Sequence, residues 1–165
     1  MMNEAKDNAK LAFYQNPGYQ LERREKKIMI IDVEIDTDTN FSVSLHEPLL
    51  IDRHSDILLD SFTTFNAKNN KEDGSDHMAF LMSINEFNIQ SNSSQSNSFN
   101  RIIIPNNATT DNTVTTHKTK KFNYICSINP GKLSQISGKI TNLANAAAFI
   151  GSGRFIAEFM VVARD

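Results

Sequence analysis

The sequence predicts an all-β protein, an eight-stranded antiparallel sandwich of the single jelly-roll type that follows an N-terminal arm. Three observations favour this fold class. From residue 27 onward, apolar side chains recur mainly at every second position, which is the period of a β-strand. Clusters of Asn, Ser, Gly and Pro separate these segments and are typical of turns. No long segment after residue 27 has a 3.6-residue period, so no βαβ alternation and no parallel sheet are expected.

The first three predicted strands are the most regular. Residues 27–35 place Met29, Ile31, Val33 and Ile35 on one face and Ile28 and Ile30 on the other. Residues 41–45 alternate apolar and Ser residues, which predicts a strand with one face in the core. Residues 55–67 are rich in the β-branched and aromatic residues that strands favour.

Four further strands are predicted before the last one. Residues 78–90 alternate, but their phase slips by one residue near Asn85 and Glu86, which suggests a bulge or a bend. The remaining three are 99–105, 121–128 and 134–143, of which the first ends at a proline and the second at Asn-Pro-Gly. Residues 143–149 are compatible with a short helical turn.

The last predicted strand, 153–164, is the most apolar segment of the sequence. One face carries Phe155, Ala157, Phe159, Val161 and Ala163, and the other carries Ile156, Met160 and Val162. In a jelly roll this strand lies between the first and third strands of one sheet. We therefore expect it to be integral to the fold, with its outer face covered by the arm or by a neighbouring subunit.

Two sandwich topologies compete, the immunoglobulin-like Greek key and the jelly roll. The first favours a buried Trp and a Cys pair, whereas this chain has no Trp and one Cys. Long polar segments at 66–77, 90–98 and 105–119 suit the long crossings of a jelly roll.

Composition argues against several classes of protein. The chain has 165 residues and a net charge of −2, which gives no overall attraction to nucleic acid or to an anionic membrane. A single cysteine excludes an internal disulfide framework and fits a reducing compartment. We expect no secretory signal and no membrane span, because the first residues lack an apolar region and no apolar run reaches 18 residues.

No residue pattern predicts a catalytic, cofactor or metal site. The four histidines lack metal-ligand spacing, and we expect His77 to lie in a polar surface loop beside Asp76. Cys126 falls within a predicted strand and is expected to be a buried apolar residue. Asp32, Glu34 and Asp36 form a period-two ladder that is more typical of a solvated or interface-facing strand than of a calcium site. Ser152 lies between two glycines, which indicates a tight turn.

Residues 1–26 form the predicted arm, and residues 27–165 form the predicted domain. The arm mixes charged residues with apolar residues of the kind found in interfaces, and it is too polar to fold alone. We therefore expect a subunit interface made by Leu11, Phe13, Tyr14, Tyr19, Arg23 and Arg24. The alternative is a solvated tail.

Four segments together carry a resemblance to a known family: "LIDRHSDILLDSFTTFNA", "MAFLMSINEFNIQSNSSQSNSFNRIIIPN", "HKTKKFNYICSINPGKLSQISGKITNL" and "RFIAEFMVVARD". In strand order, loop composition and final strand, residues 27–165 resemble the single jelly-roll capsid proteins of large icosahedral double-stranded DNA viruses, in particular the penton type. The resemblance implies a structural protein of the virion, assembled in the host cytoplasm, without catalytic residues or cofactors.

That resemblance also implies partners. Five copies would form a plug at each five-fold vertex and contact the major capsid protein and minor capsid proteins. Two alternatives stay open at this point: a minor capsid protein that cements the shell from beneath, and a trimeric binding module like tumour necrosis factor or a lectin.

Overall fold

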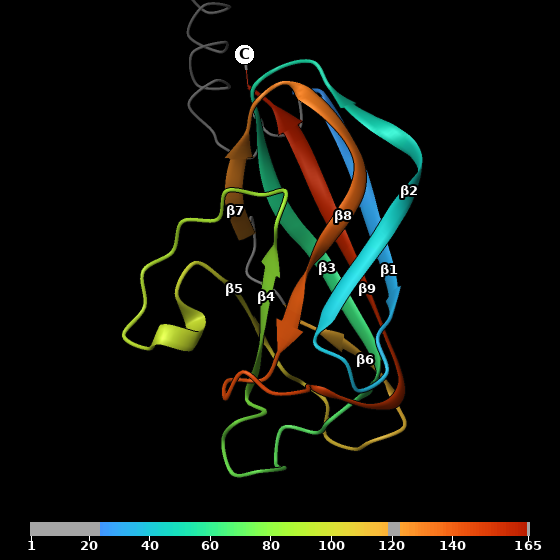
Figure 1. The fold of residues 1–165 in the computed structure, drawn as a ribbon, viewed down its shortest axis with the longest axis vertical. Helices are drawn as coiled ribbons and strands as arrows, with labels where there is room; N and C mark the ends of the chain where they lie inside the picture. The colour runs from blue at the N-terminus through green and yellow to red at the C-terminus, as the bar shows by residue number, and fades with distance from the viewer. Residues whose placement is uncertain (1–23, 119–122, 165) are drawn as a thin grey trace, which may run out of the picture.

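A computed structural model describes residues 24–118 and 123–164, which form two antiparallel β-sheets packed as a sandwich (Figure 1). One sheet has the strand order β1-β9-β3-β6, with β7 also paired to β3. The other has the order β2-β8-β4-β5. The predicted all-β sandwich is therefore confirmed. Among the described residues, no helix is long and apolar enough to cross a membrane.

Nine strands and one turn of 3₁₀-helix make up the described part of the chain. They are β1 (Lys26–Glu34), β2 (Asn40–Ile51), β3 (Ser55–Ala67), β4 (Ala79–Ile84), η1 (Ser96–Ser98), β5 (Ile102–Pro105), β6 (Val114–His117), β7 (Asn123–Ile128), β8 (Gly131–Thr141) and β9 (Phe149–Ala163). All eight predicted strands are present in some form, and the bounds of β3 are as predicted. Strand β1 begins at Lys26, so the predicted boundary of the arm lies one residue inside it.

The prediction of eight strands missed β6. This strand is only four residues long and has a single buried position, so its period-two pattern is too short to stand out. It pairs with Phe62–Phe65 of β3, whereas β7 pairs with Ser55–Leu59 of the same strand. Strands β6 and β7 therefore share one edge of the five-stranded sheet.

Near Asn85 and Glu86, where a bulge or a bend was predicted, the chain bends. Strand β4 ends at Ile84, and residues 85–86 form a turn closed by the Phe87 N–H donating to the Ile84 carbonyl (3.1 Å). Residues 143–148 contain no helical turn, because the side-chain oxygen of Asn142 accepts the N–H groups of Ala144 and Ala146 (2.9 Å each) and shapes this segment instead.

Phenylalanine side chains fill the centre of the sandwich. Phe62 and Phe155 from one sheet face Phe80 and Phe41 from the other, with ring centroids 5.4 Å apart for Phe62–Phe80 and 5.3 Å for Phe41–Phe155. Both pairs meet edge to face, the arrangement that the ring quadrupole favours. Phe149, at the start of β9, stacks on Phe80 and extends this core.

Strand β9 lies between β1 and β3, as predicted, so both of its edges are hydrogen-bonded. Its inward side chains Phe155, Ala157, Phe159 and Val161 are buried, and the outward Val162 is buried as well. Ile156, which also points outward, is partly exposed. The outer face of this strand is therefore covered at one end and open in the middle.

Candidate functional site

Five of the six predicted interface residues lie outside the described residues: Leu11, Phe13, Tyr14, Tyr19 and Arg23. Arg24 is described, and its Nη1 atom lies 3.8 Å from Asp56 Oδ2 of the same chain. Asp56 belongs to β3, on the far side of β9 from β1. The Arg24 side chain thus has a partner within the subunit, and it lies over the outer face of the five-stranded sheet.

Asp56 is the centre of a polar cluster that fixes both ends of the described chain. Arg164 Nε donates to Asp56 Oδ1 (2.8 Å), and Ser127 Oγ donates to the same oxygen (3.0 Å). Arg164 also donates to Ser127 Oγ (2.7 Å), which connects β7 to the residue that follows β9. Since Asp56 is mostly buried, these charge-assisted bonds anchor the segment before β1 and the end of β9 to the same strand.

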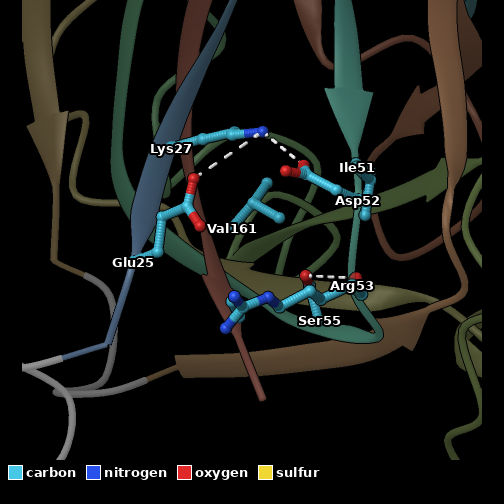
Figure 2. Close-up of a pocket in the computed structure, with 8 residues that line it drawn as sticks. Glu25, Lys27, Ile51, Asp52, Arg53, Ser55 and Val161 are labelled. Carbon is cyan, nitrogen blue, oxygen red and sulfur yellow. Dashed lines mark hydrogen bonds and ion pairs between the residues drawn. The ribbon is translucent and has the colours of Figure 1, made fainter. Parts of the chain in front are cut away.

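A second polar cluster joins the start of β1 to the turn between β2 and β3 (Figure 2). Lys27 Nζ donates to the Leu50 carbonyl (2.6 Å) and to Asp52 Oδ1 (2.8 Å), and it lies 4.0 Å from Glu25. The hydrogen bond from Lys27 lowers the pKa of Asp52 below its usual value. The adjoining cavity has a volume of about 10 Å³, room for roughly one water molecule. This cluster is a clamp between the two sheets and too small to hold a ligand.

The carboxylate ladder is engaged in bonds within the subunit. Arg154 Nε donates to Asp32 Oδ1 (2.7 Å), and its Nη2 atom donates to the second oxygen. This bidentate hydrogen bond lowers the pKa of Asp32. Asp36 Oδ1 accepts the Ser152 N–H (2.6 Å), and both residues adopt positive φ angles of 44° and 64°. The Asp36 side chain therefore holds an irregularity inside β9. The tight turn predicted at Ser152 was wrong, because residues 151–153 lie within β9, where its register with β3 shifts.

In residues 24–118 and 123–164, no group of three His, Cys, Asp or Glu side chains is arranged to hold a metal ion. An open cleft of about 580 Å³ is lined by Glu34, Asp38, Phe65 and Arg154 among others. It is shallow and has both charged and apolar walls.

Neither a protein-family model nor a curated protein matches this chain.

Two histidines are buried, and one of them contradicts the sequence prediction. His77 was expected in a surface loop, but it is 1% exposed, with Nε2 lying 3.3 Å from Asp73 Oδ2. The loop folds back over this ring, an effect of tertiary packing that a polar local sequence does not reveal. His117, on β6, is buried against Phe62 and Phe80, and its Nδ1 atom accepts the Asn107 N–H (2.9 Å).

Acid should destabilise the protein through His117. Burial lowers the pKa of His117 to about 4, and a hydrogen bond with the Pro105 backbone opposes this shift only in part. Between pH 6.5 and 4, an unfolded chain binds a proton that the folded chain does not, so the folded state loses stability as pH falls. The expected loss by pH 4.5 is about 2 to 3 kcal/mol.

Urea unfolding at pH 7 and pH 4.5 measures this loss. His117→Gln should show a smaller decrease than the wild type by about that amount, whatever its stability at pH 7. His46→Gln, a change at an exposed position, should keep the wild-type decrease. An equal decrease in the wild type and in His117→Gln would show that His117 does not titrate in this range.

Cys126 should be unreactive in the folded protein. The side chain is buried on β7, and burial raises the pKa of its thiol to about 11, so the thiolate is scarce at pH 8. A disulfide-exchange reagent should label it only after urea is added, with one thiol counted per chain. Complete labelling of the native protein within minutes would mean that β7 opens readily from β3.

Proposed function

We propose that the sandwich is a single jelly roll. The support is the strand order, once β6 and β7, which pair with successive parts of β3, are counted as one edge strand. The sheets then read first-eighth-third-sixth and second-seventh-fourth-fifth. This order follows when two Greek keys are wound together, because each of the last two strands then inserts between two early ones.

From that fold we propose a structural capsid protein, namely the penton protein that forms a pentameric plug at the five-fold vertices of a large icosahedral double-stranded DNA virus. The strand order carries the proposal, because it agrees with the family that residues 27–165 resemble. The partners would be four further copies of this chain, the major capsid protein and minor capsid proteins, with no nucleic acid. The protein would reside in the virion after assembly in the host cytoplasm and would not be an enzyme. Consistent with a structural role, Asp32, Asp52 and Asp56 each bond a basic side chain of the same chain.

Two other structural roles use a sandwich of this kind. A trimeric module like tumour necrosis factor or a lectin also packs two antiparallel sheets, and a minor capsid protein would cement the shell from beneath. The number of subunits and the location in the particle separate these roles from the penton role.

Native mass spectrometry of the purified full chain tests the stoichiometry. We expect five copies of the 18.6 kDa chain. Three copies would support the binding module instead. Gold-labelled antibody on intact particles tests the location: label at the vertices supports the penton role, and label spread over the facets would support the cement role.

Deleting residues 1–23 tests the arm. Arg24 is retained, because it bonds Asp56. If the arm serves assembly, the truncated protein should keep a β-sheet circular-dichroism spectrum and a melting temperature within a few degrees of the full chain, while its oligomer dissociates at higher concentration. A truncated protein that unfolds would place the arm in the core. One that assembles as well as the full chain would make the arm a passive tail.

A further inference from the structure

Two apolar surfaces lie on opposite sides of the sandwich. The β1 patch consists of Ile28, Ile30 and Ile156 on the outer face of the five-stranded sheet, and its first two members are more than half exposed. The β5–β7 groove, about 200 Å³, is lined by Ile89, Gln90, Ser91, Arg101, Ile102, Ile103, Asn123, Tyr124 and Ile125. In Figure 1, β1 lies at the right of the sandwich, and β5 and β7 lie at the left.

We propose that neighbouring copies pack head to tail, with the β1 patch of one copy seated in the β5–β7 groove of the next. This inference rests on the proposed assembly into a ring. A cyclic homo-oligomer needs two different and mutually complementary surfaces on each subunit. The β1 patch and the groove meet this need because they differ in shape, lie beside side chains of opposite charge and occupy opposite edges of the sandwich.

Strand β1 is a regular edge strand whose charged residues lie toward its two ends, Lys26 and Lys27 at one and Asp32 and Glu34 at the other. It pairs with β9 in unbroken register over all nine of its residues, without a bulge or a proline. The neighbouring edge, β2, is different: its residues 45–48, which include Pro48, lie opposite the single residue Ser134 of β8. Such an interruption blocks strand-to-strand association. A second chain therefore meets an open edge with exposed isoleucines at β1 and an obstructed edge at β2.

The groove offers a complementary receptor for these isoleucines. It lies beside two edge strands, β5 and β7, and Ile103 and Tyr124 at its rim are each more than half exposed. Arg101 gives the groove its only charge among the described lining residues.

A carboxylate borders the apolar β1 patch. Ile30 pairs directly with Glu158 on β9, and the carboxylate of Glu158 accepts a hydrogen bond of 3.4 Å from Ser61. Contact between the two surfaces would bury the isoleucines and bring Glu158 of one copy toward Arg101 of the next. This complementarity favours a second copy as the occupant of the groove, rather than a chain of unrelated composition.

Two single substitutions test the packing. Ile30→Lys places an ammonium group beside Glu158 within the subunit, which the fold tolerates, and carries a positive charge into a groove that already holds Arg101. Ile103→Lys places a charge at the rim of the groove, on an edge strand where lysine is well tolerated. Each variant should raise the dissociation constant of the oligomer by about tenfold or more. Val114→Lys, at a 72% exposed position on β6 outside both surfaces, is the matched control and should assemble normally.

An equimolar mixture of the two variants gives the decisive result. Ile30→Lys keeps an intact groove and Ile103→Lys keeps an intact β1 patch, so the mixture should form a one-to-one heterodimer and grow no further. Native mass spectrometry detects this species, and circular dichroism confirms that each variant is folded. Loss of assembly in Ile30→Lys alone would indicate a symmetric β1–β1 contact and overturn the proposal. Normal assembly of either variant, or two monomeric variants that form no heterodimer, would overturn it too.

The same data separate this packing from the vertex role. A wild-type pentamer that survives both substitutions overturns the head-to-tail contact and leaves the vertex role standing. A ring of another size that both substitutions dissociate supports the contact and argues against a five-fold vertex. A wild-type chain that stays monomeric at all concentrations overturns the contact, and particle labelling then decides the vertex role.

Discussion

Deleting residues 155–165 should abolish cooperative unfolding. The deletion removes most of β9, which pairs with β1 on one side and with β3 on the other. It also removes the buried Phe155, Phe159 and Val161, each of which contributes roughly 1.5 to 3 kcal/mol. Their sum is comparable to the whole stability of a small domain, about 5 to 15 kcal/mol. The remaining sheets would also expose two unpaired strand edges.

Thermal melting followed by far-ultraviolet circular dichroism and by calorimetry measures this effect. The truncated chain should show a broad, non-cooperative change or should aggregate. Val114→Ser, a substitution at a 72% exposed position on β6 outside the proposed contact surfaces, is the control and should melt close to the wild type. A soluble truncated chain with a native-like transition would show that β9 is dispensable.

Replacing Gly138 by alanine should cost about 3 kcal/mol or more, a steric effect at the upper end of what an added methyl group causes. Gly138 lies on β8 and is the partner of Phe41 on β2 and of Ile84 on β4. A Cβ atom at this position would lie 1.9 Å from the Ser83 carbonyl oxygen, a backbone atom that cannot move without separating β8 from β4.

Urea unfolding at pH 7 measures the loss, with Gly131→Ala as a matched control at the start of the same strand. The nearest atom to a Cβ atom at Gly131 is 3.9 Å away, so this variant should lie within about 0.5 kcal/mol of the wild type. Equal stability of the two variants would mean that the strands shift apart at little cost.

The sequence predicted best those strands whose two faces have different surroundings. Alternation in β1 separates the buried Met29 and Ile31 from the exposed Ile28 and Ile30, and the structure agrees at all four positions. The extension of β2 through Pro48 was not predictable, because a proline ordinarily ends a strand and is tolerated here only at an edge. Strand β6 is defined by its partner β3 and carries no clear pattern of its own.

Much less of the candidate site was readable from the sequence. Asp56 and Arg164 are 108 positions apart, and nothing in either local sequence indicates that they bond. The same holds for Asp32 and Arg154, which only the pairing of β1 with β9 brings together. The alternation in the first predicted strand did indicate a second apolar face, which became the β1 patch. The groove was not predictable, because it forms between β5 and β7, which belong to different sheets.

The central position of β9 has a consequence for the order of events during translation. This strand is the last of the described strands to leave the ribosome. Strands β1 and β3 pair with β9 and not with each other, so the hydrogen bonds on that side of each strand form only after β9 has been made. Lys26 pairs with Val162, which lies 136 positions later in the chain. Closing so long a loop costs conformational entropy before the five-stranded sheet can form. The nascent chain therefore exposes two vacant edges and the inner faces of both sheets for most of its synthesis. Slow folding and dependence on chaperones are the expected result.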